Sequence, residues 1–212
     1  LLLTLINNVT YGQVFNEGEI GVLESDTLIF YGYDFSHFKL AEAKRVGEDL
    51  TGYIPGWLAF LNEHTNSKDL ARRFKKDSVI FNLSPTKSKY KALRPDQIVT
   101  DTKHELPADS IQSIIKRYNI TEDNGIGMVV IVECFDKLTK KPSAYFVFFD
   151  IASKNILMSD YFTSKEADGY GLTNYWGVGL NAVFGKYIAD IYHVKRKEYD
   201  KMKRKKERRE KK

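Results

Sequence analysis

Cysteine, proline and long apolar runs are scarce in this sequence, and each shortage excludes a class of protein. One Cys among 212 residues cannot form an internal disulfide framework or a multi-thiolate zinc site. No apolar run approaches the roughly 18 to 20 residues that a membrane-spanning helix needs. The hydrophobic fraction of 42% is too high for an intrinsically disordered chain. The composition therefore indicates one globular domain, or at most two.

Acidic side chains are scarce at the C-terminal end. Residues 195–212 hold twelve Lys or Arg and four Asp or Glu, so this basic tail has a net charge of +8. The whole chain has a net charge of +5, so the rest of the chain has a net charge of −3. The acidic body argues against a nucleic-acid partner, because nucleic-acid-binding domains carry positive charge on a folded face. The tail itself has three interpretations: a solvated end, a contact with an anionic membrane surface, or a contact with nucleic acid. The residues that would make such a contact are Lys195, Arg196, Lys203, Arg204, Lys205, Lys206, Arg208 and Arg209.

The N-terminal residues are typical of the end of a secretory signal peptide. Leu1 to Ile6 is a short apolar run, and Thr10 and Gly12 are small residues before Gln13, as at a signal-peptidase site. We therefore expect a signal-peptide remnant at 1–12, a single domain at 13–194 and the basic tail at 195–212. The alternative is a short first strand. Export implies a periplasmic or secreted, soluble product, and no Cys follows the run to carry a lipid anchor.

The first half of the chain predicts strands and helices in alternation. The segment between residues 47 and 63 has apolar residues spaced for one helical face, with Pro55 and Gly56 either bending the helix or placing its start at Pro55. We expect the other elements from their β-branched, aromatic or amphipathic patterns. They are strands at 27–33 and 78–83, a helical turn at 68–76 and a short strand at 97–99.

The second half predicts a helix followed by a three-stranded meander. Residues 109–118 form an amphipathic pattern in which Asp109 and Gln112 have the spacing of an N-terminal cap. The segments 125–135, 144–149 and 155–162 are rich in Val, Ile, Phe and Tyr and are separated by short polar connections. We expect antiparallel strands with both faces covered, because their hydrophobicity is almost continuous.

The last predicted element is a long helix from about Asn174. Its apolar face ends near Val194, beyond which we expect a frayed charged helix or a disordered tail. A stripe of smaller residues recurs every four positions, which allows the helix to approach the sheet or another helix closely. It consists of Gly177, Asn181, Gly185 and Ala189. The expected fold is α/β (α+β): a single domain with a mainly antiparallel sheet covered by helices and a long C-terminal helix.

Asp34, Ser36 and His37 follow the first strand, and these residue types are those of a hydrolase. Neighbours in an extended segment usually point in different directions, whereas a catalytic relay must converge in space. Asp34 and Ser36 are more simply explained as side chains that hydrogen-bond a turn.

We expect neither a metal nor a cofactor. The four histidines show no metal-ligand spacing, and Cys134 lies in an apolar strand where a thiol is usually inert. The glycines at 125–127 precede a strand instead of following one, and those at 169–171 lack a following Lys-Ser or Lys-Thr. Neither cluster fits a dinucleotide or phosphate loop.

Several segments share a pattern with one family. They are FYGYDFS at 30–36, GIG at 125–127 continuing through Glu133 to Asp136-Lys137, FFD at 148–150, and GYG at 169–171 followed by NYW at 174–176. Together they resemble a family of exported Bacteroidetes proteins of unknown function. Two positions depart from its pattern, with Thr173 in place of Arg and Ser164 in place of Gly. The resemblance implies a secreted or periplasmic α/β domain and brings no activity or catalytic residue.

The sequence as a whole predicts a non-enzymatic binding or envelope-assembly module. Its partner would be an envelope protein or a small ligand. Loops on a rigid sheet are where binding residues concentrate, so we expect a ligand surface where the loop after the first strand meets the start of the last helix. Its residues would be Asp34, Ser36, His37, Tyr170, Asn174, Tyr175 and Trp176. The alternative is a hydrolase that combines the Asp34, Ser36 and His37 segment with a distant partner such as Glu133.

Overall fold

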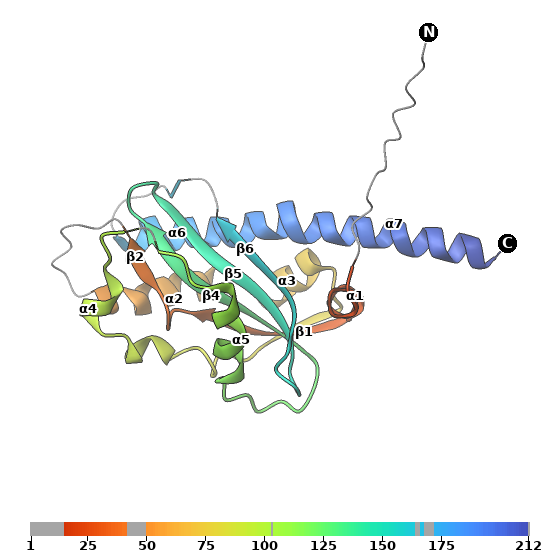
Figure 1. Cartoon of the computed structure of the whole chain (residues 1–212), viewed down its shortest axis with the longest axis horizontal. Coiled ribbons are helices and arrows are strands. Elements are labelled where there is room, and N and C mark those ends of the chain that lie inside the picture. Colours follow the sequence, from red (N-terminus) through yellow and green to blue (C-terminus); the bar gives the residue numbers. More distant parts are fainter. Residues whose placement is uncertain (1–14, 42–49, 103, 164–165, 168–171, 212) are drawn as a thin grey trace, which may run out of the picture.

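The structure is a computed structural model, and it describes residues 15–41, 50–102, 104–163, 166–167 and 172–211. The expected signal-peptide remnant at 1–12 lies outside these residues. The described part of the chain is built on one six-stranded sheet with helices on both faces (Figure 1). The predicted α/β class is confirmed, including the long C-terminal helix.

The sheet has the strand order β3-β1-β4-β5-β6, with β2 also paired to β4. The meander β4-β5-β6 is antiparallel, as predicted, and its long ladders contain most of the paired residues. The shorter pairings of β1 with β3 and β4, and of β2 with β4, are parallel. The strands are β1 (Thr27–Asp34), β2 (Lys39–Ala41), β3 (Ser78–Phe81), β4 (Ile126–Asp136), β5 (Lys141–Asp150) and β6 (Ile156–Thr163).

A bulge in β1 decides where Asp34 points. The register between β1 and β4 shifts between Phe30 and Tyr33, and Gly32 within this interval has φ +82°, a conformation that other residues rarely adopt. Phe30 and Tyr33 consequently share one face of the sheet, while Tyr31 belongs to the core of the other face. Asp34, next after Tyr33, therefore points to the same face as Tyr31.

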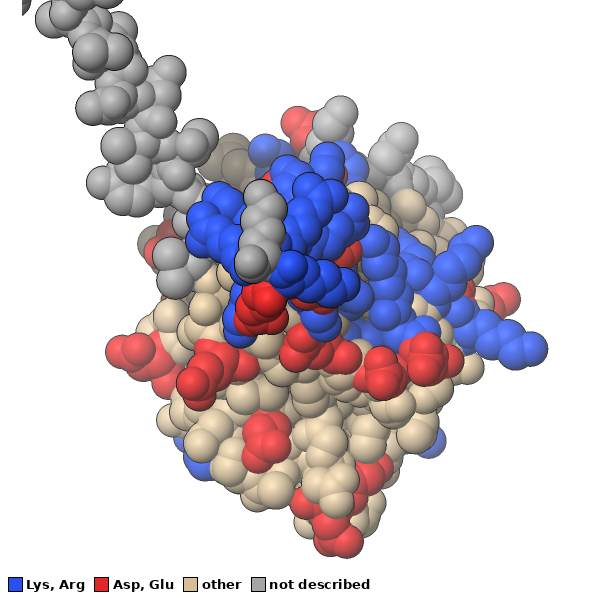
Figure 2. Space-filling view, turned by 90° about the vertical axis from the view of Figure 1, so that its right-hand side faces the viewer, with Lys and Arg blue, Asp and Glu red and all other residues tan. Residues whose placement is uncertain are grey.

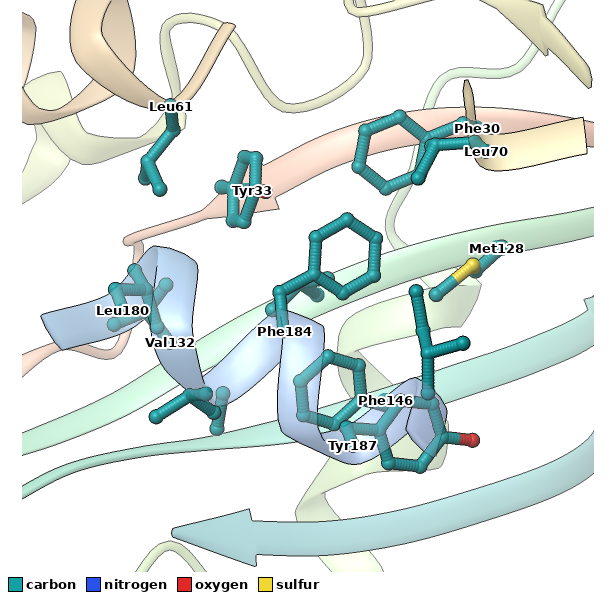
Figure 3. Packing of buried hydrophobic residues seen from close by; sticks show 14 of the residues in the cluster. Phe30, Tyr33, Leu61, Leu70, Met128, Val132, Phe146, Leu180, Phe184 and Tyr187 are labelled. Atoms are coloured by element: carbon teal, nitrogen blue, oxygen red, sulfur yellow. The ribbon is translucent and has the colours of Figure 1, made fainter. Parts of the chain in front are cut away.

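Two helical layers cover the sheet, which confirms burial of both faces for β4 and most of β5, whereas β6 is partly exposed. On one face lie α2 (Ile54–Glu63), α3 (Ser67–Phe74) and α6 (Leu172–Tyr187), and on the other lies α5 (Ala108–Lys116). Phe184 of α6 stacks on Phe30 and Phe146 with ring centroids 5.9 and 5.8 Å apart (Figure 3). These rings pack the larger core directly against β1 and β5.

One of the two alternatives for the helix at 47–63 is confirmed, and the predicted strand at 97–99 is wrong. The 3-10 helix at Leu50–Tyr53 precedes α2, which begins at Ile54 with Pro55 in its first turn, so the helix starts near Pro55. Residues 97–99 are not a strand: α4 (Pro95–Ile98) occupies most of them, and only Val99 forms a bridge, to Leu40. A second 3-10 helix lies at Lys89–Ala92.

The predicted cap of α5 is wrong. Its N-cap is Pro107, without a side-chain hydrogen bond. The Gln112 side chain instead donates to Lys154 O and accepts from Ile156 N, at 2.7 and 3.1 Å. Gln112 therefore fastens α5 to the turn between β5 and β6.

The C-terminal helix continues through the tail, which is the helical one of the two predicted alternatives. A π-helical turn (Ile188–Tyr192) joins α6 to α7 (His193–Glu210), so the tail is helical and not disordered. The small-residue stripe faces helices and not the sheet: a Cβ on Gly177 would lie 3.0 Å from Phe60 of α2, and one on Gly185 would lie 3.2 Å from Arg73 of α3. Ala189 is exposed.

Candidate functional site

Asp34 is a fully buried carboxylate with both oxygens occupied. Its Oδ1 accepts the Ser36 amide at 2.7 Å, and its Oδ2 accepts the Tyr118 hydroxyl at 2.7 Å. Burial, and after it the nearby Asp34, raises the pKa of Tyr118 well above its ordinary value, so the phenol keeps its proton and donates. The hydrogen bond from Ser36 is that of the predicted turn. The hydrogen bond from Tyr118 joins β1 to the segment after α5.

His37 lies beside Asp34 without forming a relay. Burial is the main cause that lowers its pKa, the charges of Arg117, Lys89 and Lys39 lower it further, and Asp34 opposes them. Within the described residues, the imidazole has no hydrogen bond to a hydroxyl or a carboxylate. The geometry therefore supplies no Ser-His-Asp arrangement for the hydrolase hypothesis.

The second half of the expected ligand surface divides between core and solvent. Trp176 is 3% exposed and stacks on Phe135 with centroids 4.5 Å apart, on the face opposite to Tyr118. Tyr175 is half-buried and Asn174 is exposed, whereas Tyr170 lies outside the described residues. Asp34 and Trp176 thus serve opposite faces of the sheet. Ligand binding by this set stays a prediction.

Glu133 is a second buried carboxylate on the α5 face. It is 1% exposed, and it accepts the Leu106 amide at 2.7 Å and the Ser143 hydroxyl at 2.6 Å. Glu133 and the half-buried His104 interact electrostatically: burial chiefly lowers the pKa of His104, and Glu133 opposes that shift. The His104 Nε2 atom is buried without a hydrogen-bond partner. Ile131, two residues before Glu133, pairs with Asp34, so this part of β4 lies beside the end of β1.

The first half of α7 is attached to the body by ion pairs. Lys195 Nζ lies 2.6 Å from Asp160 and 3.2 Å from Glu19, and Lys203 Nζ lies 2.8 Å from Glu24. Tyr199 is 4% exposed and also donates to Glu24. Contacts with the body therefore continue past Val194, where the apolar pattern ends.

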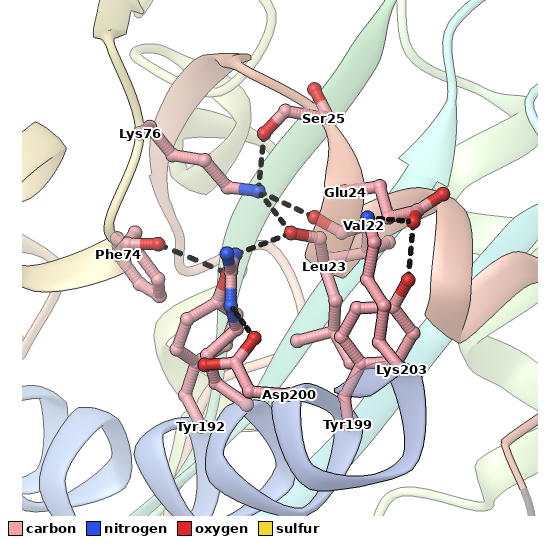
Figure 4. Close-up of polar contacts among 11 residues, drawn as sticks. Val22, Leu23, Glu24, Ser25, Phe74, Lys76, Tyr192, Tyr199, Asp200 and Lys203 are labelled. Atoms are coloured by element: carbon pink, nitrogen blue, oxygen red, sulfur yellow. Dashed lines mark hydrogen bonds and ion pairs between the residues drawn. The ribbon is translucent and has the colours of Figure 1, made fainter. Parts of the chain in front are cut away.

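These contacts converge on the C-terminal end of α1 (Glu17–Glu24). The Arg196 Nη1 atom donates to Leu23 O at 2.5 Å, and Lys76 Nζ donates to Val22 O and Ser25 O, both at 2.6 Å (Figure 4). Cationic side chains satisfy carbonyls at a helix C-terminus and complement its dipole. Basic residues from two distant segments therefore hold α1 in place.

Beyond Lys203 the same helix is exposed on all sides. Figure 2 views the molecule from the end of α7 and shows its basic side chains gathered there, with acidic ones on the body below. Within the described residues, Lys206 lies 4.0 Å from Glu210, and the other basic residues of this end have no ion pair. They are Arg204, Lys205, Arg208, Arg209 and Lys211.

Other candidate chemistry has no support among the described residues. No group of three or more His, Cys, Asp or Glu residues there could hold a metal ion. Burial raises the pKa of Cys134 to about 12, so its thiol stays protonated. None of the helices described is both long and apolar enough to cross a bilayer.

Comparisons with known proteins give no relative. No protein-family model, curated protein or solved structure matches the chain significantly. The resemblance to exported Bacteroidetes proteins therefore stays a prediction.

Sequence reasoning missed the partners of the two buried carboxylates. Tyr118 was expected only as part of an apolar helix face, and Ser143 was placed in a connection between strands. A single acidic residue inside the apolar run of β4 was the available signal, because a buried carboxylate requires donors.

Proposed function

We propose that the protein is an exported, non-enzymatic binding module that attaches to an anionic phospholipid membrane through the exposed end of α7. The observation that carries the proposal is the division of one helix into two parts. Before Arg204, Lys195 and Lys203 pair with acidic side chains of the body and Arg196 donates to Leu23 O, whereas from Arg204 onward most basic side chains have no described acidic partner.

Charge favours this membrane contact over a contact by the body. Residues 204–211 contain six Lys or Arg and two Glu, and clusters of four to eight basic residues are typical of electrostatic binding to anionic lipid. Each basic residue near such a surface contributes about 1 kcal/mol. No apolar face accompanies them, so binding should be reversible and sensitive to salt.

Vesicle binding tests the proposal. We expect the full chain to sediment with phosphatidylglycerol vesicles at low salt, and to be released at high salt or from phosphatidylcholine vesicles. The triple variant Lys205→Glu, Lys206→Glu and Arg208→Glu should bind roughly a hundredfold more weakly, from about 1 kcal/mol per basic residue. A matched triple reversal at the exposed Lys87, Lys91 and Lys137 serves as the control.

Equal binding by the two triple variants would refute the contact through α7. Binding to duplex nucleic acid that exceeds binding to anionic vesicles would replace the lipid partner with a nucleic acid. Ending the chain at Lys203 keeps the paired half of α7 and gives a second test that does not depend on charge reversal.

Export is the other part of the proposal, supported by the apolar run at residues 1–6. We expect the protein in the periplasmic or secreted fraction, with an N-terminus near Gln13. Recovery in the cytosolic fraction with residues 1–12 retained would contradict export.

A further inference from the structure

A cavity opens on the α5 face at the N-terminal end of that helix. Its volume is ≈ 510 Å³, within the range of small-molecule sites. It exists because α5 begins only at Ala108 and leaves the adjoining parts of β5 and β6 uncovered. The described residues that line it are Glu105, Leu106, Pro107, Ala108, Glu133, Tyr145 and Tyr161.

Two tyrosines form one wall of the cavity. Tyr145 and Tyr161 are directly opposite each other on β5 and β6, with ring centroids 5.1 Å apart. The Tyr145 hydroxyl donates to Leu106 O at 2.9 Å, which fixes that ring. Tyr161 is 48% exposed, so its ring remains accessible from solvent. Faces of such rings attract cations.

Glu133 gives the cavity a fixed negative charge. Both oxygens accept hydrogen bonds from neutral donors, Leu106 N and Ser143 Oγ. No described Lys, Arg or His forms an ion pair with it, and the described lining contains no basic residue. The charge of Glu133 also affects the two tyrosines. Burial is the largest cause that raises the pKa values of Tyr145 and Tyr161, and Glu133 raises both further. A buried carboxylate without a cationic partner favours the arrival of a cation.

We propose that this cavity binds a small organic cation through an ammonium group, which would lie against the Tyr161 ring and within the field of Glu133. Aromatic faces combined with a carboxylate are the chemistry that recognises ammonium groups. An anion would be repelled by Glu133, and the described residues offer no metal-ligand group here. The proposal does not depend on the basic end of α7, because that end attracts anions and the cavity attracts cations.

Titration with choline chloride, followed by NMR or calorimetry, tests the cavity. The neutral carbon analogue 3,3-dimethyl-1-butanol has almost the same shape, so we expect saturable binding of choline and no binding of the analogue. Tyr161→Ala should weaken choline binding roughly tenfold, whereas Tyr161→Phe keeps the ring and should bind within about twofold.

Glu133→Gln isolates the charge. The amide oxygen can accept from Leu106 N while the amide nitrogen donates to Ser143 Oγ, so both hydrogen bonds can remain. We expect at least a roughly tenfold loss of choline affinity, with Glu63→Gln, at an exposed position of α2, as the matched control. If Glu133→Gln does not fold, the Tyr161 pair still decides the question.

Several outcomes would overturn the proposal. These are saturable binding of the neutral analogue equal to that of choline, unchanged affinity in Tyr161→Ala, and no choline binding at millimolar concentration. Phosphatidylcholine vesicles identify the source of the ammonium group. If the vesicles compete with choline for the cavity, the natural ligand is a lipid headgroup. If only choline binds, the natural ligand is a free ammonium compound. A chain ending at Lys203 should bind choline unchanged, which separates this site from the membrane contact.

Discussion

Asp34 shows how a residue that suggests catalysis can be structural. The carboxylate has no exposed surface and accepts from Ser36 N and Tyr118 Oη. The turn bond could be predicted, because the two residues are neighbours in the sequence. The bond to Tyr118 could not, since it depends on a bulge at Gly32 and on a tyrosine 84 positions away.

Removal of the Tyr118 hydroxyl measures this role. In Tyr118→Phe, Asp34 Oδ2 loses its donor in a buried site, so we expect the free energy of unfolding to fall by about 1–3 kcal/mol. Urea denaturation measures the change, with Tyr90→Phe, where the ring is half-buried, as the control. A loss no larger than that of the control would mean that another group or water satisfies the carboxylate.

The histidines predict how stability depends on pH. Burial lowers the pKa values of His37 and His104 in the folded state, so the unfolded chain binds more protons as pH falls through the ordinary pKa of about 6.5. Stability should therefore fall as pH falls from 7 to 5. We expect His104→Gln to reduce this slope, as measured by urea denaturation at several pH values. An unchanged slope in both His104→Gln and His37→Gln would contradict the assignment.

At the scale of elements, the best-predicted part is the one with local connections. β4, β5 and β6 follow one another through short turns, so their alternation with polar connections was sufficient to predict the meander. The parallel pairing of β1 with β4 joins Ile29 to Gly127, across several helices and the strands β2 and β3. Sequence periodicity contains no information on such a register, which long-range packing selects.

The attachment of α1 is likewise long-range, and Lys76 tests it. Lys76→Met removes a donor shared by Val22 O and Ser25 O, so we expect a loss of about 1–3 kcal/mol in the free energy of unfolding. Burial lowers the pKa of Lys76 to about 8, from an ordinary value of 10.5. Between these values the unfolded chain binds more protons, so the wild type should gain stability relative to Lys76→Met as pH rises from 8 to 10.

Thermal unfolding of both proteins across this pH range measures the effect. The matched control is Lys75→Met, because Lys75 is the preceding residue and its side chain is exposed. A difference between Lys76→Met and the wild type that does not vary with pH would contradict the lowered pKa, while leaving the capping contacts intact.

At the scale of the whole molecule, the separation of charge is visible in the sequence, but its boundary is not. Counting charges places a basic tail at 195–212, whereas contacts divide the helix at about Lys203. The apolar pattern ends near Val194, so it could not reveal that Tyr199 packs edge-to-face on Phe15 at 5.9 Å or that Lys195 meets Asp160. Surface ion pairs with distant acids leave no periodic signal.

Two truncations locate this boundary by stability. A chain ending at Lys203 loses only exposed residues, so its free energy of unfolding should match that of the full chain within about 0.5 kcal/mol. A chain ending at Val194 also loses Tyr199 and the contacts of Lys195 and Arg196 with the body. Removing one buried aromatic side chain alone costs about 3–5 kcal/mol, so this chain should be at least that much less stable. Urea denaturation of the three chains compares them directly, and equal stability of the two truncated chains would mean that α7 is not attached to α1 and β6.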